Sequence, residues 1–457
     1  MNAPLYHALS RLAHTQPLRL HMPGHKGRLS GAFSHYASLD FTEIAPTGNL
    51  YTGEGPIAQA EALYAQSAHG RDALFFSCGS TQGIQTMLLA AAGVGSTVIL
   101  DRGCHKSVYN TMALLDITPV YLLPDLLPGT SLPGPISPAL LEQTLTEHPE
   151  ARAVVVTTPS YYGVITDLKP LAALCHRFGV YLLVDQAHGA HFPFLGLPSA
   201  PEEGADLCVV STHKTLPALG SSAVLLTGAQ APWTALELKQ MSSIFSTTSP
   251  SYPILASIDY ARALLEGEAG ADYRHMAALV SAMRRRISQE TLFSVLTQCP
   301  GLSLDPCRLT IDTASAGLSG HQADLLLQKQ NVYVEMSDER YLVCILTCCD
   351  REQDLDRLFS ALCSLPQRPA SHCLDFLPPP LPSRPMSIRG ALFGPKEFLP
   401  LSQAAGRISA QILAPYPPGI PVVAPGEEIT EKHIAYLQKK SYNIEECIGV
   451  NCESPIL

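Results

Sequence analysis

The stretch VYLLVD at residues 180–185 decides the fold, because five apolar or aromatic residues run without a break and end in an aspartate. Such a run is typical of a parallel strand that is buried on both faces of a sheet. A charge at the end of a buried strand costs free energy unless it is paired. In open α/β sheets ligands bind at this edge, so Asp185 is a candidate partner for a cationic ligand group. A helix cap or a local ion pair is the alternative interpretation.

Six more β-rich runs alternate with helical patterns in the same part of the chain. They lie at residues 73–77, 97–100, 119–123, 153–157, 207–211 and 222–226. This βαβ alternation predicts an α/β protein with a mostly parallel, seven-stranded sheet that is covered by helices.

The pattern divides the chain into five segments. Residues 1–60 form an N-terminal arm rich in Gly, Pro and His, in which helical periodicity is evident only near residues 56–69. Residues 61–252 form the large domain, and residues 253–376 form a smaller α+β domain with helices near 254–265 and 273–296 and strands near 302–311 and 341–346. Residues 377–385 are a stiff Pro-rich linker. Residues 386–457 form a third, C-terminal α+β domain.

Composition excludes several classes of function. With 30 basic and 40 acidic residues, the formal charge of −10 argues against a nucleic-acid surface and is compatible with a cationic small-molecule substrate. The 13 cysteines are odd in number and form no Cys-x-x-Cys pair, which indicates reduced thiols and no metal site. The N-terminus lacks a secretory signal, and no run approaches the roughly 20 apolar residues that span a bilayer. We therefore expect a cytoplasmic protein without a membrane partner.

A lysine follows another of these strands, in Ser211-Thr212-His213-Lys214. Pyridoxal phosphate (PLP) chemistry needs an unprotonated lysine amine that forms an imine with the cofactor aldehyde. It also needs a carboxylate that keeps the pyridine nitrogen protonated. Lys214 and Asp185 supply this pair at two strand ends. An isolated lysine is more often solvated, so the pairing carries the prediction.

The turn after residues 73–77 predicts a phosphate site. Gly79, Ser80 and Thr81 lead from the strand into a helix at residues 82–92. Amides at a helix start, aided by the two hydroxyls, hold an anion through unsatisfied donors and the positive end of the helix dipole. The alternative is that Ser80 or Thr81 merely caps the helix.

Three histidines lie beside these elements. His105 follows the strand at residues 97–100, where a flat imidazole could stack on the pyridine ring and help to move a proton. The alternative is a hydrogen-bonded turn residue. His188 and His213 are placed near the cofactor because they neighbour Asp185 and Lys214.

Motifs along nearly the whole chain form a known set. They are HMPGHKG (21–27), DFTE (40–43), GST (79–81), HKSV (105–108), TPSYYG (158–163), DQAHGAH (185–191), STHKTL (211–216), GRISA (406–410) and PYPPGIP (415–421). With them the chain resembles the PLP-dependent Orn/Lys/Arg decarboxylases. The resemblance implies the fold-type I architecture, in the short form that lacks an N-terminal wing domain.

The resemblance also implies a role for each matching residue. Lys214 would form the imine, Asp185 would pair with the pyridine nitrogen, and His105 would stack on the ring. Lys214 or His213 would return a proton to the substrate carbon. The phosphate would be held by Ser80, Thr81, Ser211 and His213, and by Thr247 or Thr248 from a neighbouring subunit. The site would then belong to a homodimer or a higher homo-oligomer.

The implied reaction is decarboxylation of a basic L-amino acid to agmatine or cadaverine, with arginine slightly ahead of lysine. Glu427, in a Pro-Gly-Glu segment, is the expected partner of the distal substrate cation, and Glu43 is a weaker candidate. An acidic pair that is common in the family is replaced near Asn49, which leaves specificity among arginine, lysine and ornithine open. An aminotransferase or lyase of the same fold type is the alternative enzyme, and a non-catalytic PLP-binding or regulatory protein is the third hypothesis.

Overall fold

The computed structural model describes residues 1–457 except for 268, 370–378, 416–418, 440–446 and 452–457. The α-helices are α1 (Pro4–His14), α2 (Ser34–Leu39), α3 (Gly55–Ser67), α4 (Ser80–Ala91), α5 (Lys106–Leu115), α6 (Pro138–Glu147), α7 (Leu168–Arg177), α8 (Phe192–Leu195), α9 (Thr212–Thr215), α10 (Ala235–Ser243), α11 (Tyr252–Leu265), α12 (Ala269–Glu290), α13 (Gly320–Gln328), α14 (Glu352–Cys363), α15 (Ile388–Phe393) and α16 (Glu431–Lys439). The strands are β1 (Ala73–Phe76), β2 (Thr97–Asp101), β3 (Thr118–Leu122), β4 (Ala151–Thr157), β5 (Val164–Ile165), β6 (Tyr181–Asp185), β7 (Leu207–Val210), β8 (Ala223–Thr227), β9 (Ser294–Val295), β10 (Ser303–Leu304), β11 (Arg308–Asp312), β12 (Met336–Ser337), β13 (Tyr341–Ile345), β14 (Lys396–Pro400) and β15 (Cys447–Asn451).

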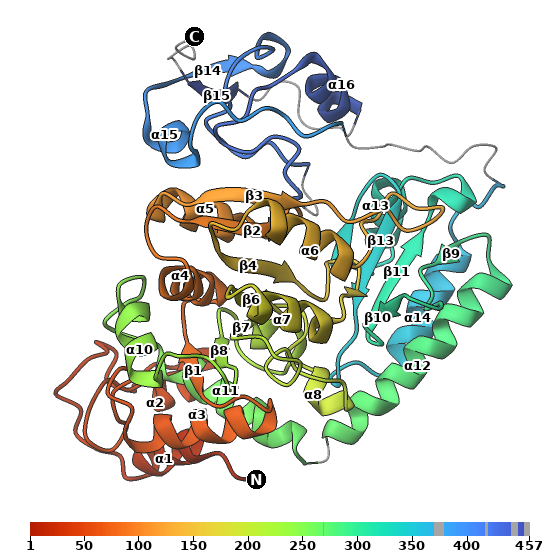
Figure 1. Ribbon diagram of the computed structural model, residues 1–457. Helices are drawn as coiled ribbons and strands as arrows, with labels where there is room; N and C mark the ends of the chain where they lie inside the picture. The colour runs from red at the N-terminus through yellow and green to blue at the C-terminus, as the bar shows by residue number, and fades with distance from the viewer. Residues whose placement is uncertain (268, 370–378, 416–418, 440–446, 452–457) are drawn as a thin grey trace.

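A seven-stranded sheet lies at the centre of the molecule, in the order β1-β8-β7-β6-β4-β2-β3 (Figure 1). Its strands are parallel except for β8, which runs antiparallel to both β1 and β7. The predicted α/β class and mostly parallel sheet are confirmed. Because β1, β2, β6 and β7 point the same way, their carboxyl ends meet at one edge.

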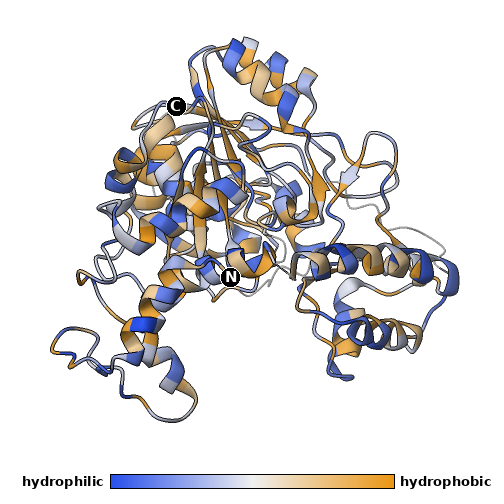
Figure 2. Cartoon of the chain, turned by 90° about the horizontal axis from the view of Figure 1, so that it is seen from below, coloured by the Kyte–Doolittle hydropathy of each residue, from blue (hydrophilic) through white to orange (hydrophobic). Residues whose placement is uncertain are grey.

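The sheet is buried on both faces, as the run at residues 180–185 predicts. Leu182 and Val184 pack into the core beneath α3, α7 and α11, whereas Leu183 packs into the opposite core beneath α4 and α5. Figure 2 shows the same arrangement, with apolar strands enclosed by helices that carry both apolar and polar residues. Alternate side chains of one strand therefore anchor two helical layers.

A smaller unit packs beside the large sheet. Its four-stranded antiparallel sheet has the order β12-β13-β11-β9 and is covered by α12, α13 and α14 around a separate apolar core. The short pair β5 and β10 joins the two units through the register Ser303 to Ile165. This junction brings β11 next to the edge of the large sheet.

The N-terminal arm departs from the expectation that only residues 56–69 are helical. Helix α1 is also present, with Leu5 and Leu9 fully buried against α3 and α11. Its first turn is capped from far away in sequence, because the Asp259 carboxylate accepts hydrogen bonds from the amides of Leu5 (2.8 Å) and Tyr6 (3.3 Å). The local pattern does not contain this cap. Helix α11 thus packs with the large unit, although the predicted small domain begins at residue 253.

The C-terminal unit contains β14 paired with β15, together with α15 and α16. Helix α15 packs on α5, so this unit covers the side of the large sheet that carries β2 and β3 (Figure 1). The predicted Pro-rich linker and the PYPPGIP motif lie partly outside the described residues. Among the helices that the structure describes, none is long and apolar enough to cross a membrane.

Candidate active site

The predicted site residues lie together at the carboxyl edge of the sheet. Asp185 ends β6, and its neighbour β7 leads through Ser211 into the single turn α9, which carries Lys214. Asp185 is buried, and its Oδ1 atom accepts a hydrogen bond from the Ala187 amide at 3.1 Å. Because β6 and β7 are adjacent, the structure brings the carboxylate and the lysine into one electrostatic cluster.

Lys214 is held in surroundings that favour its neutral amine. Burial lowers its pKa below the ordinary value, and the Arg308 guanidinium lowers it further, whereas Asp185 and Glu335 raise it. Its Nζ atom lies 3.1 Å from His188 Nε2. An amine that loses its proton easily is the form that attacks an aldehyde.

His188 connects Lys214 to a residue that the sequence analysis missed. The guanidinium Nη2 of Arg308, at the start of β11, lies 3.2 Å from His188 Nδ1, and Nη1 donates to the Tyr161 carbonyl at 3.2 Å. Burial, Lys214 and Arg308 all lower the pKa of His188 well below its ordinary value. The imidazole is therefore neutral between the Lys214 amine and the Arg308 guanidinium.

Glu335 is a second residue that sequence reasoning missed. Its carboxylate accepts a 2.5 Å hydrogen bond from the Tyr161 hydroxyl, and the Tyr161 ring meets the His188 ring edge to face at 4.8 Å. Glu335 precedes β12 in the small unit, so no sequence pattern near Lys214 indicates that it belongs to the site. The motif TPSYYG contains its partner Tyr161 and was the one sequence feature of the large unit that pointed to this contact.

The Gly79-Ser80-Thr81 turn has the form of an anion cradle. Gly79 is the N-cap of α4, no side chain caps this helix, and a Cβ at Gly79 would meet nothing within 4 Å. Ser80 and Thr81 are thus not used as caps. The hydroxyl of Ser211 is fully buried and has no hydrogen-bond partner among the described residues. A buried orphan hydroxyl needs a partner, which a ligand phosphate would supply.

Hydrogen bonds orient the rings of the other two predicted site histidines, His105 and His213. His105 is the N-cap of α5, and its Nδ1 lies 2.8 Å from the Ser107 hydroxyl. Although His105 is exposed in the single chain, the loss of water around it lowers its pKa; Lys214 lowers it further, and Asp185 opposes the shift. His213 Nδ1 donates to the Ser222 carbonyl at 2.8 Å, which leaves Nε2 for another partner.

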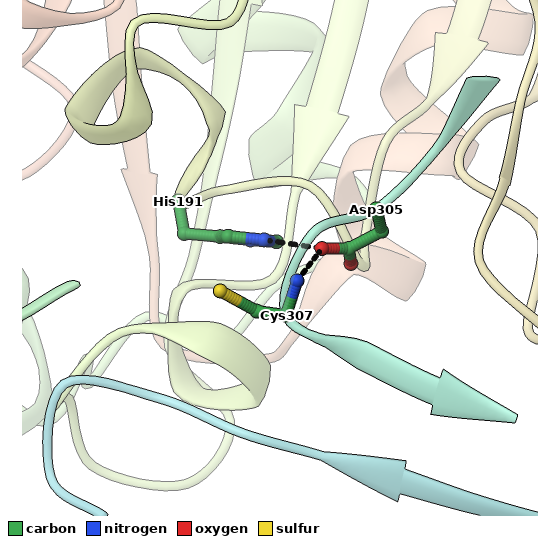
Figure 3. A group of neighbouring side chains, drawn as sticks. All are labelled: His191, Asp305 and Cys307. Atoms are coloured by element: carbon green, nitrogen blue, oxygen red, sulfur yellow. Dashed lines mark hydrogen bonds and ion pairs between the residues drawn. The ribbon is translucent and has the colours of Figure 1, made fainter. Parts of the chain in front are cut away.

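His191, Asp305 and Cys307 form a buried cluster between the large and small units (Figure 3). Asp305 Oδ1 accepts hydrogen bonds from His191 Nε2 (3.0 Å) and from the Cys307 amide (2.9 Å). Arg308 lies 3.9 Å from the other carboxylate oxygen, and Arg284 donates to the Asp305 carbonyl at 2.8 Å. These hydrogen bonds and the Arg308 ion pair make the cluster a joint between the large and small units.

The two carboxylates that were expected to bind the substrate, Glu427 and Glu43, both have hydrogen-bond partners within the protein. Glu427 is buried, and both of its oxygens are bound by Arg102, at 2.6 and 2.7 Å. A substrate role for Glu427 stays a prediction that requires this pair to open. Glu43 accepts a hydrogen bond from the Thr42 hydroxyl at 2.6 Å, in the N-terminal arm.

The candidate contacts to a neighbouring subunit are exposed. Thr247 and Thr248 both lie on the surface of the single chain, and the Thr247 hydroxyl accepts a hydrogen bond from the Ser249 amide at 3.0 Å. Their reach to another subunit stays a prediction.

Comparison with known proteins assigns the family. The model of the Orn/Lys/Arg decarboxylase major domain matches residues 3–300, and that of the C-terminal domain matches residues 387–453. The chain belongs to the Orn/Lys/Arg decarboxylase family. It is 35% identical to the arginine decarboxylase of Bacillus subtilis over 457 residues, which cover 95% of this chain and 93% of that protein. The predicted family is confirmed, and the chain is an amino-acid decarboxylase, a carboxy-lyase.

Solved structures confirm the fold. The lysine decarboxylase of Francisella novicida superposes with a TM-score of 0.82 at 20% identity, covering 98% of this chain and 80% of that chain. An alanine–glyoxylate aminotransferase from Nostoc superposes with a TM-score of 0.54 at 16% identity, covering 67% of this chain and 85% of that one. This Orn/Lys/Arg decarboxylase family member thus has the fold shared by decarboxylases and aminotransferases.

Proposed function

We propose that this family member binds PLP and decarboxylates a basic L-amino acid, with arginine ahead of lysine. The observation that carries the proposal is the electrostatic cluster at the ends of β6 and β7. There a lysine with a lowered pKa and a buried carboxylate occur together. The similarity to an arginine decarboxylase over nearly the whole chain supports arginine as the first substrate to test. Agmatine, a polyamine precursor, would be the product.

The residues of the chain fit PLP. Lys214 would hold the aldehyde carbon covalently, and Asp185 would face the protonated pyridine nitrogen. The amides that follow Gly79 and the orphan hydroxyl of Ser211 would bind the phosphate. When bound, PLP supplies an electron sink for the electron pair left behind as carbon dioxide departs. His105, held by Ser107, would pack on the ring.

Proton transfer falls to groups beside Lys214. A new proton must reach the substrate carbon after carbon dioxide leaves, and Lys214 or His213 would deliver it. His213 is oriented for this by its bond to the Ser222 carbonyl, which leaves Nε2 as the atom that carries or releases the proton.

Glu335 is the carboxylate that best supports selection of a basic substrate. Its charge acts on Lys214, so it lies near the reacting amine, and Tyr161 fixes one of its oxygens. A guanidinium or ammonium group at the end of the substrate would pair with it. Glu427, whose oxygens are both occupied by Arg102, fits this task less well, and Glu43 stays a candidate from the arm.

A homodimer or higher homo-oligomer is part of the proposal. Leu18, Leu20, Met22 and Phe33 in the N-terminal arm are 59–84% exposed in the single chain. Apolar side chains gathered on one exposed segment indicate a protein contact. A second copy that covers the arm would also bring Thr247 or Thr248 to the phosphate of the neighbouring subunit.

A substrate panel tests the proposal. Purified protein should show an imine absorbance that borohydride fixes on Lys214, and arginine should release carbon dioxide faster than lysine or ornithine. A keto acid as product would favour an aminotransferase, an enzyme that usually clamps the substrate carboxylate with arginine; Arg308, the buried arginine of this site, already binds His188 and Tyr161. Turnover of no amino acid would favour a non-catalytic PLP-binding protein.

A further inference from the structure

The proton on His188 is fixed by the chemistry of Arg308. A guanidinium has only donors, so the contact between Arg308 Nη2 and His188 Nδ1 at 3.2 Å requires Nδ1 to accept. The pKa of His188 is lowered, so the ring is neutral and carries one proton. That proton is then on Nε2, the atom that lies 3.1 Å from Lys214 Nζ.

A ring that donates from Nε2 favours the neutral form of its neighbour. The Lys214 amine accepts this hydrogen bond through its lone pair, which an ammonium group does not have. Protonated Lys214 would need Nε2 as an acceptor, and the His188 proton would have to move to Nδ1. There it would face the Arg308 donor. Two donors facing each other cost roughly the free energy of a hydrogen bond in addition to the repulsion of the charges.

We propose that Arg308 is a positioning residue that sets the tautomer of His188 and thereby keeps Lys214 in its unprotonated, reactive form. Arg308 acts through His188 and does not itself contact the reacting atoms. The inference rests on the proposed function of Lys214.

The position of Arg308 is itself fixed by buried contacts. Asp305 lies 3.9 Å from the guanidinium and is held by His191 Nε2 (Figure 3). Close packing fixes the stem of the side chain as well, because a Cβ at Gly163 would lie 2.8 Å from both the Cβ and the Cγ of Arg308. These contacts hold the Arg308 guanidinium against His188.

Other charges act on the same groups and belong in the test. Lys214 is influenced by Asp185, Glu335 and Arg308, and His188 is influenced by Lys214, Arg308, His105 and His191. Loss of the Arg308 charge alone would raise the pKa of Lys214. A readout of the tautomer is needed to separate the two effects.

The test uses the full-length protein without cofactor. Nitrogen-15 NMR of histidine-labelled protein, with the His188 signals assigned by a His188→Gln variant, should show an unprotonated Nδ1 and a protonated Nε2. In Arg308→Met the proton should redistribute toward Nδ1. A wild-type ring that carries its proton on Nδ1 would overturn the proposal without any variant at Arg308.

Reactivity of the amine gives the second readout. Labelling with acetic anhydride across a pH series, followed by peptide mass spectrometry, reports the pH midpoint at which half of the Lys214 amine has lost its proton. The exposed Lys169 serves as the reference amine. In Arg308→Met we expect the midpoint to rise by about one pH unit, and in Arg308→Lys, which keeps a cationic donor, we expect it to return toward the wild-type value. An unchanged midpoint in folded Arg308→Met would contradict the proposal. A midpoint in Arg308→Lys that is as high as the midpoint in Arg308→Met would contradict it as well.

A matched control separates positioning from stability. Arg284 belongs to the same joint and donates to the Asp305 and Arg308 carbonyls, but it has no bond to His188. Arg284→Met should lower thermal stability and leave both the His188 tautomer and the Lys214 midpoint unchanged. A midpoint that rises equally in the Arg284 and Arg308 variants would assign the effect to the joint as a whole and overturn the role of Arg308. None of these readouts requires turnover, so failure of the substrate panel would be seen separately.

Discussion

Arg102 binds both carboxylate oxygens of Glu427 in a buried, two-pronged ion pair that joins the end of β2 to the C-terminal unit. The same guanidinium also donates to the Pro421 carbonyl at 3.2 Å and the Val422 carbonyl at 3.3 Å. Burial alone would lower the pKa of Arg102, but the hydrogen bonds and charge of Glu427 raise it above its ordinary value. This ion pair, called the latch below, holds the large unit and the C-terminal unit together although the two residues are distant in sequence.

Glu427→Gln tests the latch. Removing one partner of a buried pair leaves an unpaired charge, so we expect a loss of about 3 kcal/mol in the free energy of unfolding, measured in denaturant. The Michaelis constant for arginine should change little. Glu428→Gln is the matched control, because the neighbouring Glu428 is partly exposed and its carboxylate accepts a hydrogen bond from the Ser383 hydroxyl rather than from an arginine. A raised Michaelis constant at unchanged stability would instead assign Glu427 to the substrate.

Asp185→Asn tests the carboxylate at the end of β6. The amide keeps the size of the side chain and removes the charge that would stabilise a protonated ring nitrogen. We expect turnover to fall by about 100-fold or more, while borohydride still fixes the cofactor on Lys214. Asp167→Asn, at the exposed N-cap of α7, should leave turnover unchanged. Full activity in the Asp185 variant would remove the electron-sink role from this residue.

The central sheet and the strand-end pair were predictable because both depend on local sequence. A continuous apolar run that ends in Asp185 identifies a doubly buried strand, and Lys214 follows a second such run. Parallel strands then bring the two ends together without any further information.

Other parts of the site depend on contacts that local sequence does not contain. Arg308 and Glu335 come from the small unit and reach His188 and Tyr161 only after the two units have docked. The cap of α1 comes from Asp259, more than 250 residues away. Such pairings follow from tertiary packing, in which either residue alone looks like an ordinary surface charge.

Glu335→Gln should affect the substrate and the lysine in predictable directions. Loss of a charged partner is worth about 1.5–3 kcal/mol, which corresponds to a Michaelis constant for arginine raised roughly 10- to 100-fold. Because the charge of Glu335 raises the pKa of Lys214, its removal should lower the labelling midpoint of the amine. Lys214 would then lose its proton at a lower pH, opposite to the change in Arg308→Met.

Two variants make this prediction specific. Tyr161→Phe removes the hydroxyl that holds the Glu335 carboxylate, so its Michaelis constant should lie between those of the wild type and Glu335→Gln. Glu352→Gln, in the exposed first turn of α14, should change neither quantity. A Glu335 variant that binds arginine normally would remove this carboxylate from substrate selection.

Gly83→Ala tests how α4 is placed at the end of the sheet. A Cβ at this position would lie 2.4 Å from the Val209 Cγ2 atom of β7, which is closer than carbon atoms approach one another. Helix α4 must then move away from the strand that leads to Lys214. We expect a loss of about 1–3 kcal/mol in the free energy of unfolding and weaker PLP binding, because the amides after Gly79 move with the helix.

A nearby glycine provides the comparison for Gly83. Gly93 lies just beyond α4 with φ +71°, and its Cβ would meet nothing within 4 Å. Gly93→Ala therefore introduces backbone strain without displacing the helix, so it should cost stability and leave the dissociation constant for PLP unchanged. Equal PLP affinity in both variants, measured by fluorescence titration of apoprotein, would show that the cradle at Gly79 does not depend on the contact between α4 and β7.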